Sequence, residues 1–373
     1  MDMIIFILVL SVLILVHEWG HFITAKKLGV RVEQFALGFG KKLFSFVRNG
    51  TEFRLCAIPL GGYVKMAGDE RSQCKGASDE FFSKSVGHRS LIVLMGPVVN
   101  IIFAYLCFWV VFMTGYVDMD LSSKRVVAQV GEILEGSPAQ KAGLHINDKI
   151  IRIDDQQIGN WPDMQDYVTS STGPELRFLV EREGNQVTIM ISPKEYKQKD
   201  IFGKEHTTRR VGISPVKIKS ADDMVIVRYG PGQALVKAAQ ELWDITVKTC
   251  QGLYEMAIGL RSPKEAMGIV GIFFVIKYAS SVGFAFLLHI VGVISASLAI
   301  FNLLPIIPLD GGHLLLLGIE KIRRKALAPK VEDAVMRVGF SLIIMLALFI
   351  FYVDFDRIGI IDKLTNFWHR LVP

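Results

Sequence analysis

Three ionisable side chains stand at the end of an apolar run in residues 12–25, which read VLILVHEWGHFITA. Residues 3–16 are almost wholly apolar, as in a membrane-spanning helix, and His17, Glu18 and His21 follow directly. Each charged side chain near the middle of a bilayer costs about 2.5–3.5 kcal/mol on insertion scales. A helix of this composition therefore needs something that compensates Glu18, such as a metal ion in a water-filled cavity.

The spacing of the two histidines fits a single metal ion. On an α-helix, residues four apart point in nearly the same direction, so His17 and His21 lie on one face. Two neutral imidazoles can then bind one Zn2+, and Glu18 can reach a metal-bound water and act as general base. The simpler alternative is a helix end whose polar side chains extend up to water. The cost of Glu18 in lipid favours the metal site.

A third ligand is needed, because catalytic zinc takes three protein ligands and leaves the fourth position to water. The best candidate follows a long apolar run in residues 301–315, which read FNLLPIIPLDGGHLL. Pro305 and Pro308 break the helix there, so Asp310 could present its carboxylate beside a membrane cavity. Two alternatives stay open: Asp310 could cap the next helix, and His313 is a rival ligand. We expect Asp310 to bind the cation.

The composition indicates a membrane protein with a soluble insert. The chain has 373 residues, of which 51% are hydrophobic and only 21% charged, unlike a soluble or disordered chain. Four segments approach the roughly 20 apolar residues that cross a bilayer. These predicted spans are residues 1–25, 91–117, 284–305 and 337–354.

Charge and cysteine usage exclude several other classes. The net charge is +6, but Lys and Arg gather in loops beside apolar segments, so we expect no nucleic-acid partner. The first span has no positive charge before it, which favours a retained helix over a cleaved signal peptide. The four cysteines lack a C-x-x-C spacing, so neither a structural zinc nor a disulfide framework is expected.

Charge asymmetry also sets the expected orientation. The basic segments 26–90 and 306–336 should lie on the cytoplasmic side. The N-terminus, the inserted domain and the tail 355–373 then lie on the opposite side. Segment 217–283 is partly apolar, and a fifth span there would move loop 306–336 outside. We therefore expect in-plane amphipathic helices in this segment, with simple packed helices as the alternative.

Two regions predict β-structure. Within residues 26–90, weakly alternating stretches flank Asn49 and Gly50, a pair typical of tight hairpin turns. Residues 122–216 contain ELRFLVER and QVTIMI, separated by Gly and Asn turns, which predict strands of one soluble domain. The expected fold class is a multi-pass α-helical membrane protein with about four spans, a membrane-associated β-hairpin and an inserted α+β domain.

The motifs HEWGH and NLLPIIPLDGG resemble the two signatures of the site-2 protease family of intramembrane zinc metalloproteases, in its bacterial RseP type. The resemblance covers nearly the whole chain, although Ile307 stands where the family often has proline. It implies Zn2+ bound by the three residues His17, His21 and Asp310, with Glu18 as the base.

The same resemblance implies substrate-binding residues. Asn302 and Pro305 belong to the second motif and would help to position substrate. The sequence GPVVN, with Gly96 and Asn100, is similar to the family's small-residue motif on the second helix, although Gly96 could simply allow close helix packing.

The glycine-rich β-region is similar to the family's membrane-associated β-structure, which pairs with an extended substrate strand. Gly61, Gly62 and Tyr63 would then bind substrate; the alternative is a hairpin that only seals the site. The stretch GSPAQKAGLHINDKI resembles the start of a PDZ domain. Asn147 replaces the usual glycine there, and Asn tolerates the left-handed backbone. We expect one such PDZ-like domain.

The resemblance implies a zinc-dependent intramembrane endopeptidase of the bacterial inner membrane. Its active site would lie near the cytoplasmic face and its PDZ-like domain in the periplasm. Its partners would be the bilayer and membrane-protein substrates, namely anti-sigma factors already trimmed by another protease and leftover signal peptides. Two rivals are a membrane scaffold with a vestigial site and an ion carrier. The polar groups of the first and third spans lie at one end only, which argues against a carrier.

Overall fold

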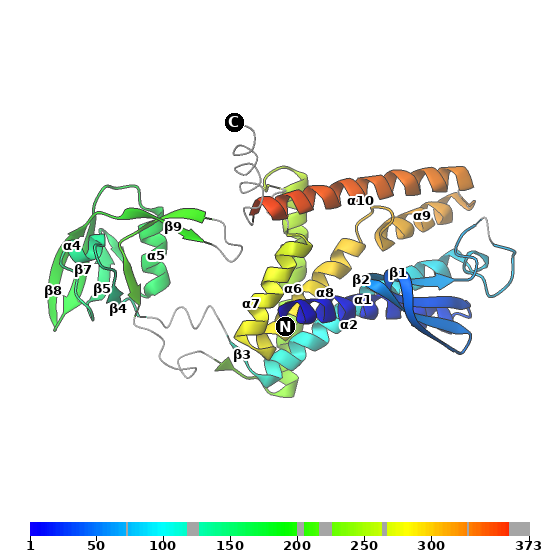
Figure 1. The fold of residues 1–373 in the computed structure, drawn as a ribbon, viewed down its shortest axis with the longest axis horizontal. Helices are drawn as coiled ribbons and strands as arrows, with labels where there is room; N and C mark the ends of the chain where they lie inside the picture. Colours follow the sequence, from blue (N-terminus) through cyan, green and yellow to red (C-terminus); the bar gives the residue numbers. More distant parts are fainter. Residues whose placement is uncertain are drawn as a thin grey trace. The chain divides into compact units, whose positions relative to one another are not determined.

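The computed structural model describes residues 1–71, 74–117, 127–199, 205–215, 226–262, 267–326 and 328–357. The chain divides into two compact units, shown in Figure 1. The first comprises residues 1–114 and 229–356, and the second is built from residues 115–228. Parts of the predicted regions 122–216, 217–283 and 355–373 lie outside the described residues.

Among the described residues, four helices are long and apolar enough to cross a membrane. They are α1 (Asp2–Lys27), α2 (Val86–Thr114), α8 (Phe284–Asn302) and α10 (Pro329–Arg357), the last with its apolar part in Ala334–Asp356. The predicted number of four spans is therefore confirmed by length and composition.

The short helix α9 (Asp310–Arg323) follows α8 after a tight loop. Proline disfavours helical backbone in the residue before it, so Pro305 stops α8 from continuing. The N-cap residue of α9 is Leu309, and Asp310 is the first residue of the helix, where an acidic side chain complements the helix dipole. The alternative in which Asp310 is the cap is therefore not what the structure shows.

The spans pack around a shared apolar core. Its buried residues come from α1, α2, α8 and the helix α7 (Ile269–Val282), and are Phe6, Val9, Leu13, Cys107, Ile276 and Val291. Helix α7 is shorter than a span and lies against α1 and α8. The apolar run near Met267 therefore forms a helix packed on the spans.

Helix α6 (Pro231–Ala257) packs against α2 and α8. The Trp109 indole donates to the Pro231 carbonyl at 3.2 Å, and the Tyr105 hydroxyl donates to the Leu235 carbonyl at 3.2 Å. Figure 1 shows α6 running across the direction of α1. Its in-plane position in a bilayer stays a prediction.

Helix α10 is held near both ends. Its Asp354 carboxylate accepts from the backbone N–H groups of Gly268, Val270 and Gly271 at 3.1–3.2 Å, at the N-terminus of α7. At the other end, Glu332 accepts from Arg71 at 2.8 Å. Most other α10 side chains are exposed, as expected for a helix that faces lipid.

The predicted hairpin is present. Strand β1 (Val32–Arg48) pairs antiparallel with β2 (Thr51–Met66), and Asn49 and Gly50 both have positive φ in the turn, at 50° and 77°. Phe35 of β1 faces two β2 residues, Phe53 and Val64. The first half of β1 therefore lies between the two halves of β2. No other described strand pairs with the outer half, residues 62–66, so it is a free edge.

The second unit has its own sheet and core. Four strands lie in the order β6 (Gln156–Gln157), β5 (Lys149–Ile153), β7 (Leu176–Arg182) and β8 (Asn185–Ile191). Strand β4 (Val130–Ile133) pairs with β11 (Ile213–Pro215), and β9 (Lys194–Lys199) pairs with β10 (Glu205–Arg210). A further short pair joins β3 (Tyr116–Val117) to β12 (Ile226–Val227).

Among its described residues, this unit also contains the helices α4 (Pro138–Lys141) and α5 (Trp161–Ser170). The side chains of Ser137 and Asn160 cap them by accepting backbone N–H groups. Asn147 has a φ of 73°, the left-handed backbone that the sequence predicted. The core lies between the sheet and α5, and includes Ile150, Ile153, Trp161, Phe178 and Ile191.

Candidate metal centre

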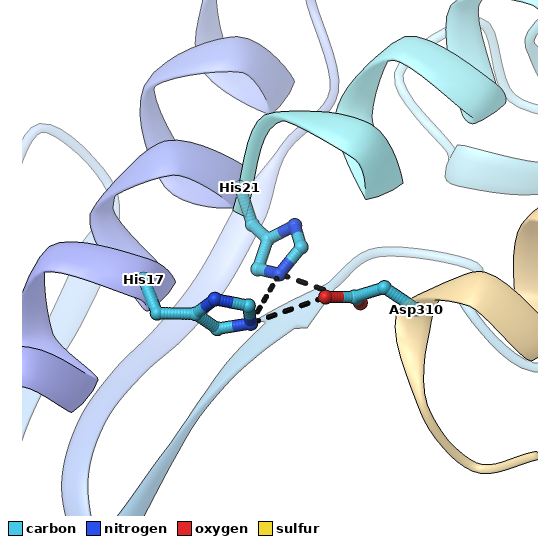
Figure 2. A group of neighbouring side chains, drawn as sticks. All are labelled: His17, His21 and Asp310. Carbon is cyan, nitrogen blue, oxygen red and sulfur yellow. Dashed lines mark hydrogen bonds and ion pairs between the residues drawn. The ribbon is translucent and has the colours of Figure 1, made fainter. Parts of the chain in front are cut away.

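Three side chains from two helices meet at one point. His17 and His21 lie one turn apart on α1, and both are buried; Asp310 comes from the start of α9. Figure 2 shows the two rings and the carboxylate facing one another. The Nε2 atoms of the histidines are 3.2 Å apart, and Asp310 Oδ2 and Oδ1 lie 3.1 and 3.6 Å from His17 Nε2 and His21 Nε2.

This geometry fits a metal ion. His21 donates from Nδ1 to the Ile92 carbonyl at 2.9 Å, so its Nε2 carries a lone pair directed at His17 Nε2. Two nitrogens bound to one tetrahedral zinc at about 2.0–2.1 Å are about 3.3 Å apart, close to the observed separation. Asp310 Oδ2 is buried, and no hydrogen-bond donor among the described residues satisfies it. One cation would satisfy all three ligand atoms.

A cavity of about 760 Å3 opens at this cluster. Glu18, His21 and Asp310 are among its lining residues. Its other lining residues come from β2, the segment after it, α2, α9 and α10, and include Val64, Met66, Arg71, Phe82, His313 and Glu332. The Glu18 side chain also lies beside strand β2, since a Cβ added to Gly62 would be 3.1 Å from Glu18 Cγ. The candidate base therefore stands between the ligand cluster and a free strand edge.

Comparison with known proteins identifies the kind of enzyme. A model of the family described as Peptidase family M50 matches residues 5–346, most of the chain. The chain belongs to peptidase family M50. The expected membership of the site-2 protease family is confirmed.

The sequence similarity to individual relatives extends over nearly the full length of both proteins. The chain is 31% identical to a Mesorhizobium japonicum protein named a zinc metalloprotease, over 94% of this chain and 97% of that protein. It is 30% identical to the regulator of sigma-E protease RseP of Escherichia coli, over 96% of this chain and 99% of that protein. The protein is a zinc metalloprotease, which decides against the scaffold and the ion carrier.

The structure places the other predicted residues of this M50 peptidase at different distances from the cluster. His313 lines the cavity but does not belong to the group of three ligand atoms. Asn302 ends α8, and Pro305 lies in the loop that leads to Asp310. Neither of these two residues lines the cavity.

Gly62 and Tyr63 begin the free edge of β2, and Gly61 directly precedes it. The Phe39 ring covers Gly61, where an added Cβ would be 2.1 Å from a ring carbon, and it stacks on Tyr63 with ring centroids 6.2 Å apart. Of the three, Gly62 faces Glu18, because a Cβ added there would be 3.1 Å from Glu18 Cγ. This edge runs from Gly62 to the cavity-lining residues Val64 and Met66.

Gly96 and Asn100 of α2 lie next to the rings of the two histidines. A Cβ at Gly96 would be 2.3 Å from His21 Nε2 and 2.9 Å from His17 Cε1. The Asn100 amide nitrogen is 3.4 Å from His17 Nδ1. Both residues therefore touch the rings on α1 from the side of α2.

Sequence reasoning missed an ion-pair network beside the cavity. Arg89 of α2 and Arg71 both bond to Glu320 of α9, at 2.7 and 2.6 Å, and both lie over the Phe82 ring. The bonds from Arg89 and Arg71 hold the pKa of Glu320 below its ordinary value. The partners are separated by more than 200 residues, so no local pattern signals the contact.

Proposed function

We propose that this M50 peptidase cleaves a peptide bond within a membrane-spanning segment of another protein. The observation that carries the proposal is the convergence of His17, His21 and Asp310 beside Glu18, in a cavity walled by spans and bordered by a free strand edge. Zn2+ held by these three residues would polarise the scissile carbonyl and make a water nucleophilic at neutral pH.

In this proposal, Glu18 transfers the proton as general base and then as general acid. Its carboxylate lines the cavity next to the ligands, so it can take a proton from the attacking water. It can later pass that proton to the leaving amine. The burial of the cluster between α1, α2 and α9 limits bulk water to the cavity.

The substrate would bind as an added strand. A helical peptide bond is shielded by its own hydrogen bonds, so an intramembrane protease needs an extended backbone. The free edge of β2, which begins at Gly62 and Tyr63 directly after Gly61, has no further strand partner among the described residues and lies beside Glu18. Asn302 and Pro305, which precede Asp310, would contact the substrate from the opposite side.

The charge pattern supports an orientation in which the cluster lies near the cytoplasmic face and residues 122–216 lie in the periplasm. The location is the bacterial inner membrane. Because the Escherichia coli relative is named a regulator of sigma-E protease, we propose anti-sigma-factor-like membrane proteins, already trimmed outside, as substrates. Leftover signal peptides have the same form, a short apolar span without a folded outer domain.

The second unit serves as a PDZ-like filter in this proposal. Its capped turn at Ser137, left-handed Asn147 and sheet with α5 are consistent with a PDZ-like domain. A bulky domain on the same side of the membrane as the outer part of the substrate would admit substrates whose outer part is short.

Cleavage of a model transmembrane peptide in detergent, with zinc content measured in parallel, tests the proposed function. Glu18→Gln should keep one zinc per chain and lose cleavage, because it removes the base and leaves the ligands. His17→Ala should lose both zinc and cleavage. His88→Ala, which removes an exposed histidine, is the control and should behave as wild type. Wild-type cleavage by Glu18→Gln would contradict the proposed chemistry.

A further inference from the structure

One stripe of α2 faces both histidines. Ile92, Gly96 and Asn100 are spaced four residues apart, so they lie along one side of the helix. The Ile92 carbonyl accepts from His21 Nδ1, Gly96 leaves room for both rings, and the Asn100 amide faces His17 Nδ1. The contacts of Ile92 and Asn100 are with the Nδ1 atoms, whereas Gly96 lies beside His21 Nε2 and His17 Cε1.

The contact with His21 shows what a neutral histidine ligand needs. A neutral imidazole carries one proton, and the nitrogen that binds a metal must be the unprotonated one. An acceptor at Nδ1 holds the proton there and leaves Nε2 free. The Ile92 carbonyl is such an acceptor, since a carbonyl oxygen has no proton to donate.

His17 has the same need, and the Asn100 amide is the group at its Nδ1. Asn100 is fully buried, and no donor among the described residues reaches its Oδ1, while its Nδ2 lies 3.4 Å from His17 Nδ1. A half-turn of the amide exchanges two atoms of nearly equal size. It brings the unsatisfied oxygen to Nδ1–H and turns the nitrogen away, so both the amide oxygen and the imidazole proton gain a partner.

We propose that Asn100 is a positioning residue whose amide oxygen holds the proton of His17 on Nδ1 and so directs Nε2 to the metal. The inference rests on the proposed zinc site and assigns Asn100 to the metal ligand instead of the substrate. The position of Asn100 is fixed from a third helix, because Ser295 of α8 donates to the Asn100 backbone carbonyl at 2.9 Å. Ser295 is itself fully buried.

Zinc affinity tests the proposal through two substitutions of similar size. Asn100→Leu removes the acceptor, and zinc affinity measured by competition with a chelator should fall about 10- to 100-fold. Asn100→Asp keeps an acceptor, and its affinity should stay close to that of wild type. Cys107→Ala, at another buried position of α2, is the control for a loss of packing and should bind zinc normally. A substrate-binding Asn100 would instead give normal zinc affinity in Asn100→Leu with a raised KM.

The tautomer of His17 can also be measured in the wild-type protein. A variant is needed only to assign the His17 signal. Ring nitrogen shifts of 15N-histidine-labelled, zinc-free protein should show His17 protonated on Nδ1, with the signal assigned by its loss in His17→Gln. Protonation on Nε2, or unchanged zinc affinity in Asn100→Leu, would overturn the role of Asn100. If wild-type protein binds no zinc, or His17→Ala binds it as tightly as wild type, the proposed zinc site itself fails.

Discussion

Substitution of Gly96 by alanine should disrupt the zinc site although it replaces none of the ligand residues. Gly96 is buried on α2 at the point where the two histidine rings of α1 approach the helix. The added Cβ would lie 2.3 Å from His21 Nε2 and 2.9 Å from His17 Cε1. Ordinary contact between such atoms needs about 3.5 Å, so the His21 ring must retreat by about 1 Å.

Separating the two helices to relieve this overlap would break the close packing between their backbones. A Cβ added at Gly20 of α1 would lie only 2.2 Å from the Met95 carbonyl oxygen, so the backbones of α1 and α2 are already in contact one residue from Gly96. Metal–ligand distances tolerate about 0.2 Å, a fifth of the required shift. We therefore expect Gly96→Ala to lower zinc affinity by about 100-fold or more, which corresponds to about 2.7 kcal/mol or more.

The assay is zinc affinity by chelator competition, with zinc content and cleavage of a model peptide measured on the same samples. Gly87→Ala is the matched control, because it makes the same change on the same helix with no neighbouring atom closer than 4.0 Å. Gly87→Ala should bind zinc and cleave as wild type does. Full zinc affinity and full activity in Gly96→Ala would refute the close-packed arrangement of α2 and the histidines.

Three further predictions concern the ligand set, stability and selection. Asp310→Ala should lose zinc and activity, while His313→Ala should keep zinc; the reverse result in metal analysis would transfer the ligand role to His313. Glu320→Gln should destabilise the fold by roughly 3 kcal/mol, seen as a lower midpoint of thermal unfolding in detergent. Because the pKa of Glu320 is lowered in the folded state, its stabilisation of the fold is present above the ordinary pKa of a glutamate and is lost as the pH falls through the folded-state pKa. At neutral pH, equal midpoints of thermal unfolding for wild type and Glu320→Gln would contradict this. Deletion of residues 122–216 should leave cleavage of a pre-trimmed substrate intact and allow cleavage of the full-length form; loss of both, with zinc and folding normal, would show that the domain delivers substrate.

The parts of the fold that follow local rules were predictable from the sequence. Long apolar runs predict spans because bilayer thickness fixes their length, and the Asn49-Gly50 pair predicts a hairpin because both residues accept positive φ. The double pairing of β1 with both halves of β2 was not predictable. It depends on several register shifts along a long strand, which the alternation of residue types does not encode.

The candidate site also has parts that were predictable from the sequence and parts that were not. The helix period alone brings His17 and His21 together, and the broken apolar run points to Asp310. The contacts of α2 were not predictable, because the acceptor for His21 is a backbone carbonyl that any residue at position 92 would supply. The sequence marked Gly96 and Asn100, but only the packing of α2 against α1 shows that they face the rings of the histidines.

The most direct test of the zinc site is a crystal structure of the Glu18→Gln protein with anomalous scattering measured at the zinc edge. The proposed arrangement predicts a single zinc peak within about 2.0–2.2 Å of His17 Nε2, His21 Nε2 and an Asp310 oxygen. A zinc peak elsewhere in the chain, or one bound by His313 in place of Asp310, would contradict it.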